Sequence, residues 1–351
     1  MYKQTYRLGP LNIELTTIDQ AQHQQIMTGW RHLFRIDLAA SPTPTEQTIY
    51  LRLEPTAAAM GATALSPQSL LSTQGVIQIG QTANGLQCCC GATMFQIDPV
   101  QPQAVGYVAA DFWNYALVEQ RSFWQTLFFL LVRRTGCALL HANALYPEAL
   151  GPEAGVLFVG DCGSGKTSLT LSLITAGWRY VTDDTVLLQP SKPVDAPPAG
   201  PVRSLQAYAV RRGFACTEQT VAQWPWLAAL ATSGAALNRQ KTLIDLDSRY
   251  TTSFAPICSP RALFFPRRNG AAQSQMHALT RTQSFTALLG QSHNGLLVEP
   301  AFTPPLLTLF HALVEQTCSY QLDLGWDVFT APAQVSALLT SVLPTGSENA
   351  S

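Results

Sequence analysis

The stretch VLFVGDCGSGKTSLTLSLI, from Val156 to Ile174, contains the strongest motif of the chain. Within it, Gly160–Thr167 matches the phosphate-binding pattern G-x-x-x-x-G-K-[ST] at every position. The short apolar run before the motif is typical of a buried strand, and the apolar residues after it predict a helix that stops at Gly177. The sequence therefore predicts the strand, glycine-rich loop and helix that this motif requires.

The residue types of this loop are those that bind a nucleotide triphosphate. Glycines allow the backbone to turn N–H groups toward a phosphate, and the following helix adds its positive end. Lys166 brings a point charge to the β- and γ-phosphates, and the hydroxyl of Thr167 is a ligand for Mg²⁺. We expect ATP to be held by Gly160, Asp161, Cys162, Gly163, Ser164, Gly165, Lys166, Thr167 and Ser168.

An acidic pair, Asp183-Asp184, ends the next predicted strand, 17 and 18 residues after Lys166. A kinase needs one carboxylate for Mg²⁺ and a second to accept the proton of the attacking hydroxyl. The pair supplies both, and the pattern alone leaves open which residue has which role. The short spacing differs from that of motor ATPases, whose acidic residue follows a strand further along the chain.

Composition and the remaining motifs exclude several other classes. The chain has 351 residues, of which 47% are hydrophobic and 12% charged, with a net charge of −1. This predicts a folded core and gives no basic stripe for nucleic acid. No Asn-Lys-x-Asp element for reading guanine is present. The longest apolar run, 123–132, is interrupted by Gln125 and is shorter than the roughly 20 residues that span a bilayer.

The chain is expected to be cytoplasmic and not membrane-bound. Its first residues have no apolar segment of the signal-peptide type. The eight cysteines do not pair by spacing and form no C-x-x-C motif, which favours reduced thiols and gives no zinc site.

Two regions differ in their predicted secondary structure. Residues 1–110 are expected to form a β-rich, antiparallel accessory or substrate-docking layer, and 111–343 an α/β domain in which strands and helices alternate. Residues 344–351 are expected to be a disordered tail. Predicted strands are Thr48–Leu53, Val76–Gly80, Gly85–Cys90, Thr93–Ile97, Cys137–Tyr146, Val156–Gly160, 241–246, 261–266 and 319–325, with helices in 111–135, 166–176, 282–290, 304–317 and 332–343, and partly in 217–237.

From Ala138 to Leu188 the chain resembles the core of the HPr kinase/phosphorylase family. That family has a His on a strand, a P-loop after an apolar strand, a helix ending in Gly, and a strand ending in Asp-Asp. LLHANALY and GVLFVGDCGSGKTSLTLSLITAGWRYVTDDTVLL contain these features in the same order, and a weaker resemblance extends to residue 343.

The resemblance implies a mixed-sheet fold similar to phosphoenolpyruvate carboxykinase and transfer of the γ-phosphoryl group of ATP to a serine hydroxyl. It implies three catalytic residues: Asp183 as the general base, His141 beside the acidic pair, and Lys166. It also implies Thr167 and Asp184 as the Mg²⁺ ligands.

The chain departs from the family downstream of Leu188. A glycine-rich signature with a Mg²⁺-binding Glu is missing there, and a proline-rich segment, Pro190–Pro201, follows instead. The expected acceptor is therefore a serine of a peptide or small protein other than HPr, as in the divergent relatives that phosphorylate peptide precursors. Two alternative functions are a kinase for small-molecule hydroxyls and a non-catalytic nucleotide-binding module. The sequence does not decide whether the reverse reaction, phosphorolysis, occurs or whether the protein is a homo-oligomer. Weaker candidates for phosphate or acceptor contacts are Lys241, Arg203, Arg211 and Arg212.

Overall fold

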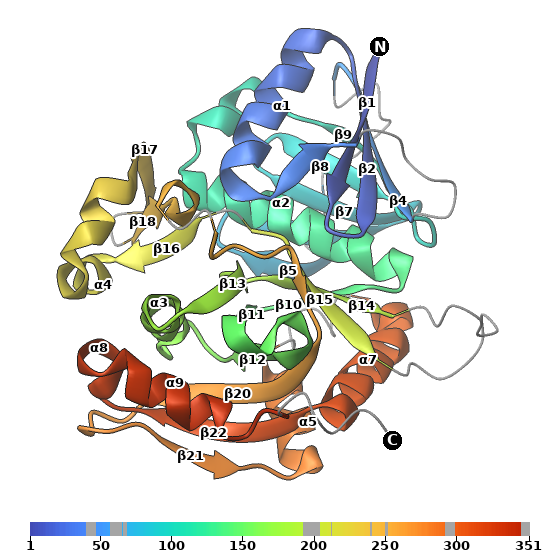
Figure 1. Ribbon diagram of the computed structural model, residues 1–351. Helices are drawn as coiled ribbons and strands as arrows, with labels where there is room; N and C mark the ends of the chain where they lie inside the picture. The colour runs from blue at the N-terminus through green and yellow to red at the C-terminus, as the bar shows by residue number, and fades with distance from the viewer. Residues whose placement is uncertain are drawn as a thin grey trace.

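The fold is mixed α/β, as predicted, and consists of two stacked parts (Figure 1). The computed structural model describes residues 1–39, 47–56, 65, 69–191, 204–211, 213–238, 241–249, 252–291 and 299–344. Within these ranges the strands form sheets of nine, six, four and three strands. We call the nine-stranded sheet with its two helices the N-terminal layer, and the other sheets with their helices the P-loop core.

The N-terminal layer has the strand order β3-β1-β2-β4-β9-β8-β7-β6-β5. The expectation of an antiparallel layer is wrong at two pairs, because β4 runs parallel to both β2 and β9. The predicted bounds of β4, β7 and β8 are confirmed. The strands are β1 Tyr2–Leu8, β2 Leu11–Thr17, β3 Ile36–Leu38, β4 Thr48–Leu53, β5 Leu70–Gln74, β6 Ile77–Thr82, β7 Gly85–Cys90, β8 Thr93–Ile97 and β9 Gln103–Tyr107.

Two helices, α1 (Gln20–Leu33) and α2 (Leu117–Val132), pack on this sheet. The sequence did not predict α1. Asp19 caps its N-terminus, because the side chain of Asp19 accepts a hydrogen bond from the Gln22 amide at 2.9 Å. The apolar run 123–132 lies in α2, and its aromatic side chains join the core of the N-terminal layer, as predicted for a buried helix. No helix in the described part of the chain is long and apolar enough to cross a membrane.

The P-loop core is built on a six-stranded sheet of order β13-β11-β12-β20-β22-β21. Strands β20 and β22 run parallel to β12, so their carboxyl ends meet the P-loop at one edge. A four-stranded sheet, β10-β14-β15-β19, lies beside it. The strands are β10 Ala138–Leu140, β11 Ala142–Pro147, β12 Gly155–Val159, β13 Trp178–Thr182, β14 Val186–Pro190, β15 Leu205–Ala209, β19 Ile257–Cys258, β20 Pro260–Arg268, β21 Gln275–Ala278 and β22 Cys318–Leu324.

The chain passes directly between these two sheets at three points, the last of them at Ser259, from β19 to β20. The predicted strand 137–146 is in fact two strands, β10 in the four-stranded sheet and β11 in the six-stranded sheet, which meet at His141. The second passage, from β13 to β14, contains Asp183 and Asp184. The first two crossings therefore coincide with predicted site residues.

The remaining elements complete the P-loop core. The predicted helices are confirmed as α3 Lys166–Thr175, α5 Arg281–Gly290, α7 Thr303–Gln316 and α9 Pro332–Thr340, with α8 Asp327–Thr330 in addition. The segment 217–237 is only partly helical, since α4 (Glu218–Gln223) is followed by a 3₁₀ turn and then by β17 (Ala231–Asn238). Strand β17 pairs with β18 (Lys241–Ile244), which pairs with β16 (Phe214–Thr217). Arg203, Arg212, most of the proline-rich segment and the predicted tail from 345 lie outside the described residues.

Candidate active site

The P-loop joins the end of β12 to the first turn of α3 and needs glycine at defined positions. Gly163 and Gly165 have φ of +87° and +102°, a region that side-chain-bearing residues rarely adopt. A Cβ atom on Gly165 would also lie 2.6 Å from Cδ1 of Leu324. The loop can therefore follow this path only with glycine at position 165.

Lys166 lies under this loop with only 6% of its surface exposed. Its Nζ donates to the carbonyl oxygens of Gly160 and Asp161, the latter at 3.0 Å, and lies 3.2 Å from Nε2 of His141. Burial lowers the pKa of Lys166, while the nearby acidic pair opposes that effect. The ammonium group is thus fixed between the loop and His141.

Asp183 is almost completely buried and surrounded by uncharged donors. Its Oδ1 accepts from Asn143 Nδ2 at 2.8 Å and from the hydroxyl of Thr167 at 3.0 Å, and its Oδ2 from the Ala215 amide at 3.3 Å. Burial raises the pKa of Asp183, partly offset by the charge of Arg211. We call Asn143, Thr167 and Asp183 the neutral half of the site.

Asp184 is surrounded by cations instead. Its Oδ2 accepts a bond from the buried guanidinium of Arg211, and its Oδ1 lies 3.4 Å from Nδ1 of His141. Burial disfavours the charge, yet Arg211, followed by His141, holds the pKa of Asp184 well below its usual range. We call Asp184, Arg211 and His141 the cationic half of the site.

The backbone at Asp184 explains how neighbouring carboxylates reach different surroundings. Asp184 has a φ of +69° and is the one non-glycine residue of the described chain with positive φ. Aspartate tolerates this left-handed conformation better than most residues, but such positions cost energy and gather at functional sites. The turn directs one carboxylate to the P-loop and the other to the cations.

The contacts of His141 define its tautomer. Nδ1 lies 2.8 Å from the carbonyl oxygen of Asp184, which can only accept, so Nδ1 carries the proton. Nε2 is then free to accept from Lys166. Burial lowers the pKa of His141, with Asp184 opposing the effect, which agrees with a neutral ring.

Asn143 holds the acidic turn in place, and the sequence analysis missed it. Its Nδ2 donates to Asp183 and to Thr170 Oγ1 at 2.9 Å, and its Oδ1 accepts from the Asp184 amide at 2.8 Å. A signal was available, because Asn143 follows His141 by two positions, and side chains two apart in extended chain share a face.

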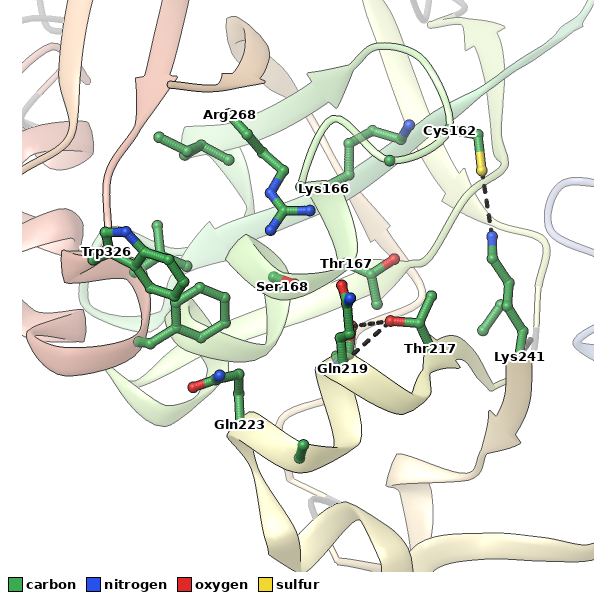
Figure 2. A pocket seen from close by; sticks show the side chains of 18 of the residues that line it. Cys162, Lys166, Thr167, Ser168, Thr217, Gln219, Gln223, Lys241, Arg268 and Trp326 are labelled. Atoms are coloured by element: carbon green, nitrogen blue, oxygen red, sulfur yellow. Dashed lines mark hydrogen bonds between the residues drawn. The ribbon is translucent and has the colours of Figure 1, made fainter. Parts of the chain in front are cut away.

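A cavity of about 650 Å³ opens over the P-loop. Figure 2 shows Cys162 and Lys241 at one end and Trp326 at the other, with Arg268 between them. Lys241 Nζ lies 3.4 Å from Cys162 Sγ, and Trp326 is 52% exposed. The other residues that line the cavity come from the P-loop and the start of α3, the acidic turn, β16, α4, α8 and the segments at the ends of β20 and β22: Gly163, Gly165, Lys166, Thr167, Ser168, Asp184, Ala215, Thr217, Gln219, Thr220, Ala222, Gln223, Gly270, Leu324, Gly325, Val328 and Phe329.

The structure brings the predicted catalytic residues together. His141, Lys166 and Asp184 form one connected group, and Thr167 joins it through Asp183. Arg211, a weaker candidate, pairs with Asp184, and Lys241 lines the cavity. Elsewhere in the loop, Asp161 accepts a bond from Gln291 at 2.9 Å.

The donor set of the neutral half fits Mg²⁺. The Thr167 hydroxyl and the Asp183 carboxylate are hard oxygen donors 3.0 Å apart at the start of α3. Mg²⁺ in phosphate-transfer sites is held by one or two such groups together with phosphate oxygens and water. Thr167 and Asp183 are therefore the protein groups that would hold this ion, beside the loop that would hold the phosphates.

No protein-family model matches the chain, and no curated protein matches it. Among solved structures, the HPr(Ser) kinase/phosphatase from Coxiella burnetii matches with a TM-score of 0.31 and 13% identity, over 58% of this chain and 88% of that one.

Proposed function

We propose that this protein is an ATP- and Mg²⁺-dependent kinase that transfers the γ-phosphoryl group to a serine hydroxyl of a peptide or small protein. The observation that carries the proposal is the division of the acidic pair. One carboxylate bonds to the P-loop threonine, while the other borders the cavity beside a neutral histidine and a buried arginine. A phosphoryl transferase needs carboxylates in these two settings.

We assign the roles of the pair in the order opposite to that implied by the family resemblance. Asp183 bonds to Thr167 and does not border the cavity, which suits the Mg²⁺ side. Asp184 borders the cavity, where an acceptor hydroxyl would arrive. Its lowered pKa keeps it ionised, so it can accept the hydrogen bond of that hydroxyl and orient the oxygen for in-line attack.

The other residues position charge around the transfer. Bound Mg²⁺ would neutralise charge on the β- and γ-phosphates. Lys166 and the loop amides would stabilise the negative charge that develops on the transferring group. His141 orients Asp184 from one side and Lys166 from the other, through its two ring nitrogens. Because the transition state of phosphoryl transfer is loose, positioning matters more here than the strength of the base.

A cavity of about 650 Å³ lies within the size range of nucleotide and cofactor sites. The exposed ring of Trp326 suits stacking on a base at the end of the cavity away from Cys162 and Lys241. A kinase for small-molecule hydroxyls shares all these features and differs only in its acceptor. A non-catalytic nucleotide-binding module would have no use for a second carboxylate beside the cavity.

Transfer from γ-labelled ATP to candidate serine peptides, small proteins and small hydroxyl compounds tests the proposal. Asp184→Asn should bind nucleotide with undiminished Mg²⁺ dependence but lose transfer. Asp183→Asn should lose the Mg²⁺ dependence of binding as well, and the exposed Asp37→Asn serves as the matched control.

If instead Asp184→Asn loses the Mg²⁺ dependence of binding and Asp183→Asn loses only transfer, the roles are those that the family resemblance implies. A third outcome would favour the non-catalytic nucleotide-binding module. In that case Asp184→Asn binds nucleotide with intact Mg²⁺ dependence, and the unaltered protein transfers phosphate to no acceptor.

A further inference from the structure

Arg121, on α2 of the N-terminal layer, is a partly buried cation, and two of its guanidinium nitrogens have no acceptor within the described part of the chain. Its Nε and Nη1 are shielded from solvent and make no hydrogen bond within the described residues. Burial lowers the pKa of Arg121 to about 10, and the charges that act on it are, in order, those of Arg211, Asp184, Asp183 and Cys162. The guanidinium therefore lies among the acidic pair, the buried Arg211 and the P-loop.

Neighbouring contacts fix this face of α2 against the site. Gln125 lies one helical turn after Arg121, and its Nε2 donates to Thr185 Oγ1 at 2.5 Å, next to Asp184. Figure 1 shows α2 along the side of the N-terminal layer that meets the P-loop core.

Two ion pairs hold the N-terminal layer and the P-loop core together. Arg35 binds both carboxylate oxygens of Asp247 at 2.9 Å, and Arg134, just after α2, binds Glu299. The position of Arg121 is thus determined by the packing of the two parts.

Buried guanidinium nitrogens without acceptors are costly unless something supplies the missing acceptor and counter-charge. Three cations, Lys166, Arg211 and Arg121, face two carboxylates at the site, and Arg211 already pairs with Asp184. The site is consequently short of negative charge, as a phosphate-binding site is before its ligand arrives.

We propose that Arg121 contacts the γ-phosphoryl group of the bound nucleotide, so that the N-terminal layer supplies a cation to a site otherwise built by the P-loop core. This inference rests on the proposed function. The γ-phosphate lies on the Mg²⁺ side of a P-loop, between the loop and the metal-side carboxylate. Cys162 and Asp183, which mark that space, are both among the groups whose charges act on Arg121.

The experiment measures the affinities of a non-hydrolysable ATP analogue and of ADP, with Mg²⁺, by calorimetry on the full chain. Arg121→Met keeps the apolar stem and removes the charge, Arg121→Lys keeps the charge without the planar fork, and the exposed Arg31→Met on α1 is the matched control. The unaltered protein and Arg31→Met should prefer the ATP analogue by about tenfold or more, the contribution expected of a charge-assisted bond. Arg121→Met should abolish this preference, leave ADP affinity unchanged and unfold at the same or a higher temperature. Arg121→Lys should retain part of the preference.

The possible failures are distinguishable. An unchanged preference for the ATP analogue in Arg121→Met overturns the inference and leaves the proposed function standing. If Arg121→Met changes only the KM for the acceptor in the transfer assay, the inference is also overturned, because Arg121 would then contact the acceptor and not the nucleotide. If the unaltered protein binds neither nucleotide, the proposed function fails and the inference falls with it. If Arg121→Met does not fold, loss of the preference in Arg121→Lys still supports the inference, and full retention there overturns it.

Discussion

The neutral and cationic halves of the site differ in how each carboxylate is stabilised, although Asp183 and Asp184 are adjacent in the chain. Asp183 receives three hydrogen bonds from uncharged groups, while Asp184 is held by Arg211 and lies beside His141. Burial raises the pKa of Asp183, whereas the surrounding cations lower that of Asp184. Opposite environments of this kind give two identical side chains different chemical roles.

Lys166 connects the P-loop to the cationic half, so its loss should have the largest effect. Lys166→Ala removes the contacts with the loop carbonyls and with His141, and it removes the charge expected at the phosphates. We expect phosphotransfer to fall by about 10³-fold with the fold retained, measured with labelled ATP and circular dichroism. The exposed Lys3→Ala is the control, and near-normal transfer by Lys166→Ala would refute the site assignment.

The cationic half should depend on charge pairing. Arg211→Met leaves Asp184 without its buried partner and should cost about 3 kcal/mol of unfolding free energy, measured with urea. Adding Asp184→Asn should recover much of this loss, because the uncompensated charge is then gone. If the cost of the double variant equals the sum of the costs of the two single variants, the two side chains are not coupled.

The neutral half should depend on hydrogen bonds instead. Asn143→Ala removes one of the three hydrogen bonds to the carboxylate of Asp183 and leaves the amide of Asp184 without its acceptor, and should cost about 2 kcal/mol. Asn114→Ala, at an exposed position of the N-terminal layer, should change stability by less than about 0.5 kcal/mol. A similarly small change at Asn143 would mean that the acidic turn holds its shape without it.

The smallest effect should come from the titration of His141, whose side chain is 34% exposed. Because burial lowers its pKa, the unfolded chain binds more protons than the folded one just below the ordinary value of about 6.5. The unfolding free energy should therefore rise with pH through that window and fall on acidification. His141→Gln should flatten the dependence, while His23, whose pKa burial also lowers, contributes equally to both proteins. Identical slopes would contradict the lowered pKa.

Local sequence signals predicted the P-loop side of the site well. The glycine pattern, the following helix and the acidic pair are close in sequence, so their spacing alone brings them together. Strands β4, β7 and β8 also have the predicted bounds, since alternating or β-branched runs between turns mark their ends. In each case the determining interactions lie within a few residues.

The parts that were missed depend on contacts distant in sequence. Nothing near β4 indicates that it lies between two parallel partners, because that pairing is set by packing across the sheet. Helix α1 has an aspartate cap, but its glutamine-rich first turns give a weak apolar pattern. Arg121 precedes the apolar run of α2 without any motif, and only the packing of α2 on the acidic turn brings it to the site.

Two of the three sheet crossings make the residues proposed as catalytic part of the architecture. His141 joins β10 to β11, and the Asp183-Asp184 turn joins β13 to β14, so these residues also guide the chain from one sheet to the next. A descendant that lost phosphoryl transfer would still be under selection to keep the histidine and the acidic turn for folding. In such proteins an intact glycine in the loop at position 165, together with a cation at position 121, would be the better marker of retained chemistry.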